Sequence, residues 1–268
     1  MEEPPYITNL LQRYKIRDIG SFPALSDKLE SDCLLASTLY FIIEGIEDTE
    51  VGVRQNIAQI VRMDLGLMTV EDRIARKKAR GDYLPGERTL VHSFFAGENV
   101  PHIIRFCGYV LFEICNMWDL TANFLRCLYD VKLEEKKCRF PVIYDSLKSK
   151  EELTPFFDGL EIRLDHNGLA CFSEDSVMKR LLEPRNRVAH SLNFSSVAAK
   201  LRAGATNETT ICLYDPCKEG GKLVRILTFP EWKDRVAKSY AHFVTNYCKL
   251  LETIDERTER LGGLRDEK

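Results

Sequence analysis

The sequence lacks the long apolar run that a membrane-spanning helix needs. Its most apolar stretch, residues 103–128, is interrupted by charged and amide side chains, whereas a span requires about 20 mainly apolar residues in succession. The first residues are acidic and proline-rich, so they also lack the basic and apolar regions of a secretory signal. We therefore expect a soluble protein with no membrane segment.

Cysteine occurs nine times, an odd number, and no two pairs have the spacing of zinc ligands. Scattered cysteines in a chain without a secretory signal are typical of the reducing cytosol, where thiols stay free. We expect a cytoplasmic protein that binds no metal ion and needs no cofactor.

Several motifs of known chemistry are also missing. The sequence contains no phosphate-binding loop, dinucleotide fingerprint, Gly-x-Ser-x-Gly elbow or His-Glu-x-x-His pair. Its formal charge of −3 argues against a general nucleic-acid coat, which is usually basic. That charge still permits an enzyme that binds a few phosphates locally.

Helical spacing of apolar residues dominates the pattern. A helix capped by Ser26 is expected to place these residues inward: Leu29, Leu34, Leu35, Leu39, Ile42, Ile43 and Ile46. Further helices are expected from Asp48 or Thr49 to Met63, from Thr69 to near Gly81, from Pro101 to Leu133, over 142–150, and from Pro230 onward.

Two regions have the sequence pattern of β-strands, either polar residues that alternate with apolar ones or segments rich in β-branched residues. One hairpin is expected within 161–172 around the turn Asp165–Gly168, and another pairs 209–214 with 222–228. The predicted fold class is mainly α with one or two small β-hairpins. We divide the chain into an N-terminal arm (1–23), N-terminal helices that pack on the core (24–97) and a helical core (98–268) with its hairpin at about 208–228.

The segment Arg185-Asn186-Arg187-Val188-Ala189-His190 is the most informative part of the sequence. It resembles the active-site motif of HEPN-family proteins, helical bundles in which an Arg is followed by four to six residues and then His. The residue after the Arg is commonly polar in that family, as Asn186 is here, and Ala189 before the His is also typical. The resemblance is sharp over 185–191 and extends loosely over the helices from about Pro101 to Glu259.

Many HEPN proteins are metal-independent endoribonucleases that act as toxins or antiviral effectors, with both motifs of a dimer at one cleft. The resemblance therefore implies a HEPN-like helical bundle, an RNA substrate, a homodimer, and an antitoxin or regulatory protein as a further partner. It also implies three catalytic residues, Arg185, Asn186 and His190.

The residue types support this chemistry independently. Cleavage of RNA without a metal ion needs a group that transfers protons near neutral pH, and His is the side chain whose ordinary pKa lies there. It also needs a permanent cation that binds the phosphate, which Arg provides with a rigid set of donors. Asn186 and His190 are four residues apart, so they share one face of a helix.

A non-catalytic reading of the same residues stays open. The motif could belong to a helical module that binds a nucleotide, an RNA or a protein partner, since binding also uses Arg and Asn. His190 could instead cap a helix end, where a cation is favoured, with the arginines solvated.

Two further groups of residues are candidates for the site. Glu113, Asn116 and Asp119 lie near one stripe of the longest predicted helix, where they form either a polar wall beside His190 or a solvent face. The remaining candidates could bind the RNA backbone or form a solvated helix face, and they are Arg187, Arg73, Arg76, Lys77 and Lys78.

Overall fold

The structure is a computed structural model that describes residues 10–30, 33–81, 87–134, 138–181, 197–200, 210–215 and 222–260. It describes the backbone alone for residues 63–77, 87–105, 197–200, 210–215 and 222–233.

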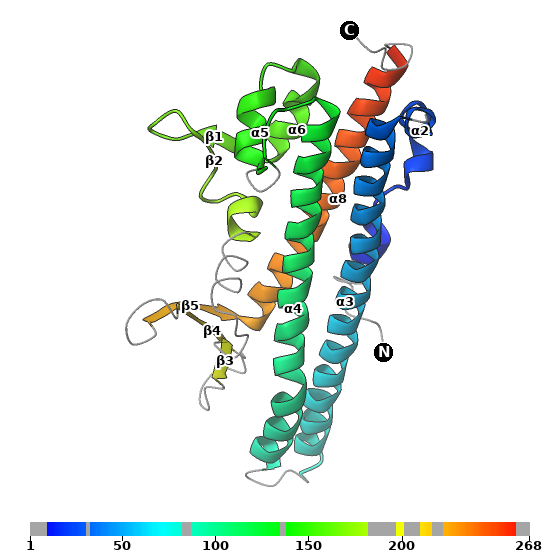
Figure 1. Ribbon diagram of the computed structural model, residues 1–268. Helices are drawn as coiled ribbons and strands as arrows, with labels where there is room; N and C mark the ends of the chain where they lie inside the picture. The colour runs from blue at the N-terminus through cyan, green and yellow to red at the C-terminus, as the bar shows by residue number, and fades with distance from the viewer. Residues whose placement is uncertain are drawn as a thin grey trace. The chain divides into compact units, whose positions relative to one another are not determined.

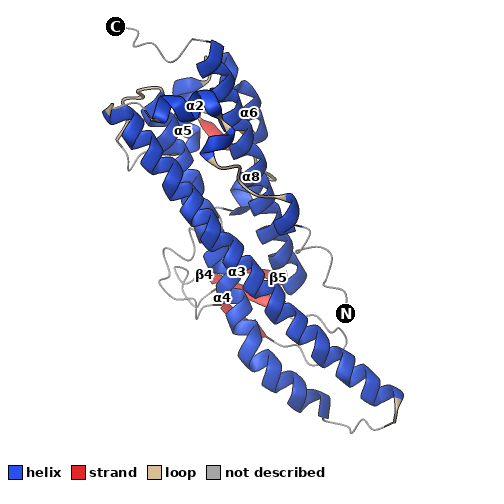
Figure 2. Cartoon of the chain, turned by 90° about the vertical axis from the view of Figure 1, so that its right-hand side faces the viewer, coloured by secondary structure: helices blue, strands red, loops and turns tan. Residues whose placement is uncertain are grey.

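Helices make up most of the described chain (Figure 2), so the predicted mainly α class is confirmed. In chain order (Figure 1) the helices are η1 (Ile19–Ser21), α2 (Pro23–Leu29), α3 (Leu34–Ala79), α4 (Glu87–Leu128), α5 (Phe140–Leu147), η3 (Glu151–Leu153), α6 (Thr154–Gly159) and α8 (Phe229–Arg260). The strands are β1 (Ile162–Leu164), β2 (Ala170–Phe172), β3 (Val197–Lys200), β4 (Thr210–Asp215) and β5 (Lys222–Thr228).

The first predicted helix is in fact two helices. Helix α2 begins at Pro23, and Ser26 lies inside it, where its backbone N–H donates to the Phe22 carbonyl at 2.8 Å. Ser26 is therefore not the cap, because a proline at the first helical position already starts the helix. Leu34 and Leu35 were expected to point inward, but they are 85% and 43% exposed.

Helix α3 is continuous where the sequence predicted two separate helices. Thr49, expected at a helix start, is mid-helix, and its hydroxyl donates to the Gly45 carbonyl at 2.7 Å. A threonine that bonds back in this way needs no break in the helix. The end near Gly81 is confirmed, since Gly81 has φ of +75° and its N–H donates to the Lys78 carbonyl at 3.2 Å.

Helix α4 begins at Glu87 rather than at Pro101, which lies inside it. It ends at Leu128, five residues before the predicted end, in a left-handed turn. Asp130 has φ of +47°, and the N–H of Val131 donates to the Arg126 carbonyl at 2.9 Å. This backbone turn satisfies carbonyls of the last helical turn that would otherwise lack partners.

Both predicted hairpins are confirmed. Strands β1 and β2 are antiparallel with Arg163 opposite Cys171, and β4 and β5 are antiparallel with Cys212 opposite Ile226. The pairing of β3 with β4, in which Ala198 lies opposite Cys212, was not predicted and makes the second sheet three-stranded.

The chain divides into two compact units, each built from segments that are distant in the sequence. One comprises Met1–Gln12, Val53–Phe112 and Pro184–Ala237, and the other comprises Arg13–Gly52, Glu113–Glu183 and Lys238–Lys268. Helices α3, α4 and α8 contribute a segment to each unit. The arm, N-terminal helices and core predicted from the sequence are consecutive ranges, and they stay predictions.

The second unit has an aromatic core centred on Trp118 of α4. The Trp118 ring lies 5.3 Å from Phe140 of α5 and 4.8 Å from Phe243 of α8, both nearly edge-on. Edge-to-face contacts of this kind add to the stabilisation from burying the rings. Helix α8 buries an apolar repeat that consists of Val236, Tyr240, Phe243, Val244, Tyr247, Leu250, Leu251 and Ile254.

In that same unit α3 and α4 approach closely through glycines. A Cβ on Gly45 would lie 3.7 Å from Leu120 Cδ1, and a Cβ on Gly52 would lie 3.3 Å from Glu113 Oε1. The glycines are seven residues apart and so are their partners, in the opposite chain direction. This spacing is that of two antiparallel helices in contact along one seam.

The segment 14–25, which runs into α2, is held against α8 by polar contacts. The Arg17 guanidinium pairs with Glu252 at 2.6 Å, and Asp255 accepts the N–H of Leu25 at 2.8 Å. The buried Tyr240 hydroxyl bonds the carboxylate of Glu50 and the carbonyl of Tyr14, the latter at 3.2 Å. Glu50 is 4% exposed, so it needs such partners.

Candidate functional site

The Arg–His motif lies outside the described residues. Arg185, Asn186, Arg187 and His190 come after a helical segment at 177–181 and before β3 at Val197. The predicted catalytic geometry stays a prediction.

The polar residues of α4 do not share one environment. Glu113 packs against α3, with its Oε1 3.3 Å from where a Cβ of Gly52 would be. Asn116 is exposed, and Asp119 is half-buried. Their expected role beside His190 is a prediction that these contacts do not address.

Asp119 belongs to a chain of polar contacts that the sequence did not reveal. Asn123 donates to the Asp119 carbonyl at 3.2 Å and accepts from Arg126 Nε at 3.1 Å. Arg126 also bonds the buried thiol of Cys138. Burial raises the pKa of Cys138 to about 11, which the nearby Arg126 opposes, so this thiol is a poor nucleophile near neutral pH.

The candidate RNA-binding residues Arg73, Arg76, Lys77 and Lys78 lie in the last turns of α3. The backbone of Arg73, Arg76 and Lys77 is helical, and the side chains of Lys78 and Arg80 are exposed. Helical spacing spreads Arg73, Arg76, Lys77 and Arg80 over one broad face. That face has the charge that a phosphate backbone requires.

Two buried polar groups meet in the aromatic core. The ring centroids of Trp118 and His242 are 5.8 Å apart, and Asn246 donates to the His242 carbonyl at 2.8 Å. Among the described atoms, neither Trp118 Nε1 nor His242 Nε2 has a hydrogen-bond partner. Burial lowers the pKa of His242 to about 4, so this histidine is neutral at pH 7 and suits a core position rather than general acid–base catalysis there.

A second titratable cluster joins Tyr129 to α8. Arg257 pairs with Glu152 at 3.0 Å and lies 5.0 Å from the centre of the Tyr129 ring, whose hydroxyl bonds Glu152 at 3.3 Å. Burial raises the pKa of Tyr129 to about 12, against the effect of Arg257. Through these contacts the neutral side chain of Tyr129 connects the end of α4 to Glu152 of η3 and Arg257 of α8.

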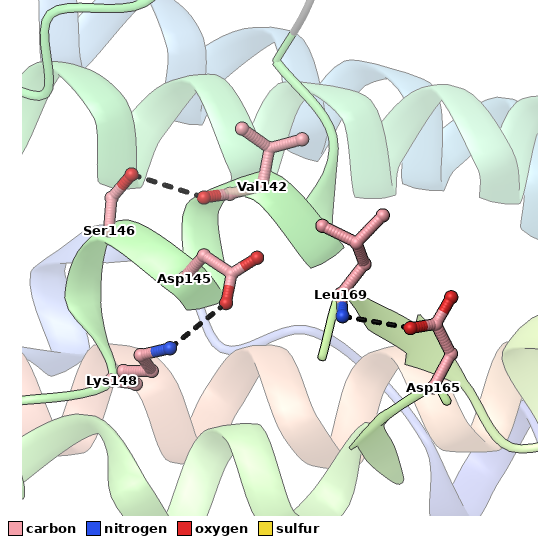
Figure 3. A network of polar contacts seen from close by, with 6 residues as sticks. All are labelled: Val142, Asp145, Ser146, Lys148, Asp165 and Leu169. Carbon is pink, nitrogen blue, oxygen red and sulfur yellow. Dashed lines mark hydrogen bonds and ion pairs between the residues drawn. The ribbon is translucent and has the colours of Figure 1, made fainter. Parts of the chain in front are cut away.

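The polar contacts around the first hairpin are local (Figure 3). Asp165 accepts the N–H groups of Asn167 and Leu169 at 2.8 and 2.9 Å, which fixes the turn between β1 and β2. On α5, Ser146 donates to the Val142 carbonyl at 3.1 Å, and Lys148 pairs with Asp145 at 3.2 Å. These contacts order the backbone and bring no set of reactive groups together.

Where side chains are described, no three His, Cys, Asp or Glu residues converge as metal ligands would. None of the described helices combines the length and the apolar character that crossing a bilayer requires. Comparisons of the chain with protein-family models, curated proteins and solved structures found no match. The HEPN resemblance accordingly rests on residues 185–191 and on the helical character of the chain.

Proposed function

We propose that the protein is a metal-independent endoribonuclease of HEPN type that cleaves RNA through the ribose 2′-hydroxyl. The observation that carries the proposal is the spacing of Arg185, Asn186 and His190. It combines a group that titrates near neutral pH with a permanent cation and a polar amide. The mainly helical architecture is compatible with this family.

In this mechanism His190 moves the proton and Arg185 binds the phosphate. The 2′-oxygen loses its proton and attacks the adjacent phosphorus, the bond from phosphorus to the 5′-oxygen breaks, and that oxygen takes up a proton. The products are a 2′,3′-cyclic phosphate and a free 5′-hydroxyl. Arg185 compensates the charge that develops on the phosphate oxygens, and Asn186 positions His190 or the phosphate.

A homodimer would complete this site. One chain supplies one Arg–His pair, whereas attack and departure benefit from both a base and an acid. A two-fold axis would bring a second His190 to the same cleft through an isologous interface. The end of α3, with Arg73, Arg76, Lys77 and Lys78, would guide the RNA backbone together with Arg187.

The proposed setting is the cytoplasm, with a role as a toxin or antiviral effector held in check by an antitoxin or regulatory protein. Glu113, Asn116 and Asp119 are proposed to support the site. Single alanine variants of these three residues, assayed beside the catalytic variants, test that role.

The decisive experiment is incubation of the purified protein with mixed RNA in EDTA, followed by end-group analysis. We expect 2′,3′-cyclic phosphate or its hydrolysed form. The His190→Ala variant should lose on the order of 10²–10⁴-fold in rate while its circular dichroism spectrum is unchanged. Arg185→Ala should be comparably damaging, and Arg187→Ala is the matched control with a smaller effect.

Two outcomes would count against this proposal. Products with a 3′-hydroxyl and 5′-phosphate, formed only with added magnesium, would mean a different nuclease mechanism. Binding of RNA without cleavage, unchanged in His190→Ala, would support the non-catalytic module instead.

A further inference from the structure

A groove lies between η1 and α2 on one side and the first turns of α3 on the other. It has a volume of about 390 Å³, and its lining includes the apolar side chains of Ile19, Leu29, Tyr40 and Phe41 together with Glu30. All of these residues belong to one compact unit. Its volume is near the lower limit of ligand pockets, which hold about 300–1,000 Å³.

Exposed apolar side chains of α3 lie in the groove, and one lies further along the same helix face. Phe41 is 68% exposed, Tyr40 is 44% exposed, and their rings are 6.1 Å apart. Leu34 lies seven residues before Phe41, so it shares the same helix face, and it is 85% exposed. Single exposed apolar residues are ordinary, but the neighbouring rings of Tyr40 and Phe41 expose apolar surface beside a groove, which is typical of an interaction site.

The same region is strongly acidic. From Asp18 to Glu50 the sequence has eight Asp or Glu residues and a single basic residue, Lys28. Glu44 and Asp48 are exposed and continue the stripe of Leu34 and Phe41 along α3. The groove therefore combines apolar residues of η1, α2 and α3 with the serines Ser26 and Ser37, and acidic residues lie beside it on α3.

The pKa of the half-buried Glu47 carboxylate shows the effect of the acidic residues around it. It accepts a hydrogen bond from the backbone of Ile19, a residue of the groove, and its Oε1 has no partner among the described atoms. Burial raises the pKa of Glu47, and the like charges of Asp18, Asp48 and Glu44 raise it further. A cation placed beside this cluster would relieve that repulsion.

This combination excludes several kinds of occupant. Nucleic acids and anionic membranes carry negative charge, which the carboxylates repel. A small ligand in a pocket is usually buried over 70–90% of its surface, whereas Phe41, which lines the groove, and the neighbouring Leu34 are mostly exposed to solvent. An extended apolar partner with positive charge fits both features.

We propose that this groove, formed by Ile19, Leu29, Glu30, Tyr40 and Phe41 with the adjoining Leu34, Glu44 and Asp48, docks a basic amphipathic helix of a partner protein. Apolar side chains of such a helix, repeating at i, i+3 or i+4 and i+7, would cover Phe41, Tyr40 and Leu34. Lys or Arg side chains along its flanks would lie opposite Glu30, Glu44 and Asp48. The inference is independent of the proposed nuclease activity.

The test uses the full chain and a fluorescein-labelled designed helix of about 18 residues, with leucines on one face and lysines on both flanks. Its partner probe has glutamates in place of the lysines. Fluorescence anisotropy should show saturable binding of the lysine probe alone, weakened as salt rises from about 50 to about 300 mM. Phe41→Ser should weaken binding by at least about tenfold, and Glu44→Lys by roughly threefold with a smaller salt dependence.

Leu169→Ser is the matched control, because Leu169 is 61% exposed on the β1–β2 hairpin and should leave binding unchanged. Thermal unfolding of each variant verifies the fold, and Phe41 is exposed enough for its replacement to be tolerated. Equal binding of both probes, or unchanged binding by Phe41→Ser, would overturn the proposal. So would a wild-type dimer in sedimentation that Phe41→Ser converts to monomer, because a second copy would then cover the groove.

Discussion

Replacing His242 with phenylalanine removes a buried titratable ring from the core around Trp118 while keeping an aromatic side chain in its place. Burial lowers the pKa of His242 from 6.5 to about 4. Within the folded protein the ring therefore stays neutral at pH values where the unfolded chain has already taken up a proton. The stability of the wild type is fully present above pH 6.5 and should fall as the pH decreases toward 4, because the unfolded state binds more protons there.

The size of the effect follows from the two pKa values. Each pH unit between them corresponds to about 1.36 kcal/mol, so the complete loss is about 3 kcal/mol, and about 2 kcal/mol of it falls between pH 7 and pH 5. No charged group contributes to the lowered pKa of His242, whose cause is burial. The loss should therefore be nearly independent of salt.

The assay is urea unfolding followed by tryptophan fluorescence and circular dichroism at pH 7 and pH 5. Other groups titrate equally in the wild type and in His242→Phe, so the difference between their pH dependences isolates His242. The matched control is His166→Gln, since His166 is exposed in the β1–β2 turn. If His242→Phe lost as much stability as the wild type between these pH values, the assignment of His242 as a buried neutral group would be wrong.

Three further substitutions test other contacts by the same unfolding assay at pH 7. Gly159→Ala should destabilise the fold by about 1–3 kcal/mol, because the new Cβ would overlap the Oδ1 of Asn246, which is only 7% exposed; an unchanged midpoint would refute this close contact. Asp130→Gly should stabilise the fold by about 0.5–1 kcal/mol, since glycine adopts the positive φ of this turn freely. The ion pair with Lys132 that is lost is exposed and contributes little. A destabilised variant would contradict the positive φ assigned to residue 130. Tyr240→Phe should cost about 1–3 kcal/mol, because Glu50 loses a buried donor, and a neutral result would mean that another donor replaces it.

The sequence predicted those parts of the fold that depend on local patterns. The last helix has an unbroken apolar repeat. The first hairpin has a polar turn after a segment that alternates polar and apolar residues, and the second has turn residues between β-branched segments, so each could be located from its own residues. The pairing of β3 with β4 joins two segments on either side of residues 201–209, and no local sequence pattern predicts it. Thr49 and Pro101 gave false helix starts, because residues favoured at helix ends also occur inside long helices whose packing sustains them.

The candidate site residues, too, could be predicted from the sequence only in part. Residue types and spacing were enough to single out Arg185, Asn186 and His190. The environment of His242 could not be predicted, because the lowered pKa comes from burial by residues distant in the sequence, such as Trp118 of α4. Leu34 and Leu35 fitted the apolar repeat of α3 but are exposed. Their burial would require another element to cover that side of the helix, and the repeat alone cannot predict such a neighbour.

The contacts that hold residues 14–25 against α8 have a consequence for the order of folding during synthesis. Tyr14, Arg17 and Leu25 meet their partners on α8 across 226, 235 and 230 residues of sequence. The ribosome releases this segment long before it makes α8, at about 5–20 residues per second. For at least about ten seconds the early segment must wait without those partners, and its final attachment can only follow the emergence of the last long helix.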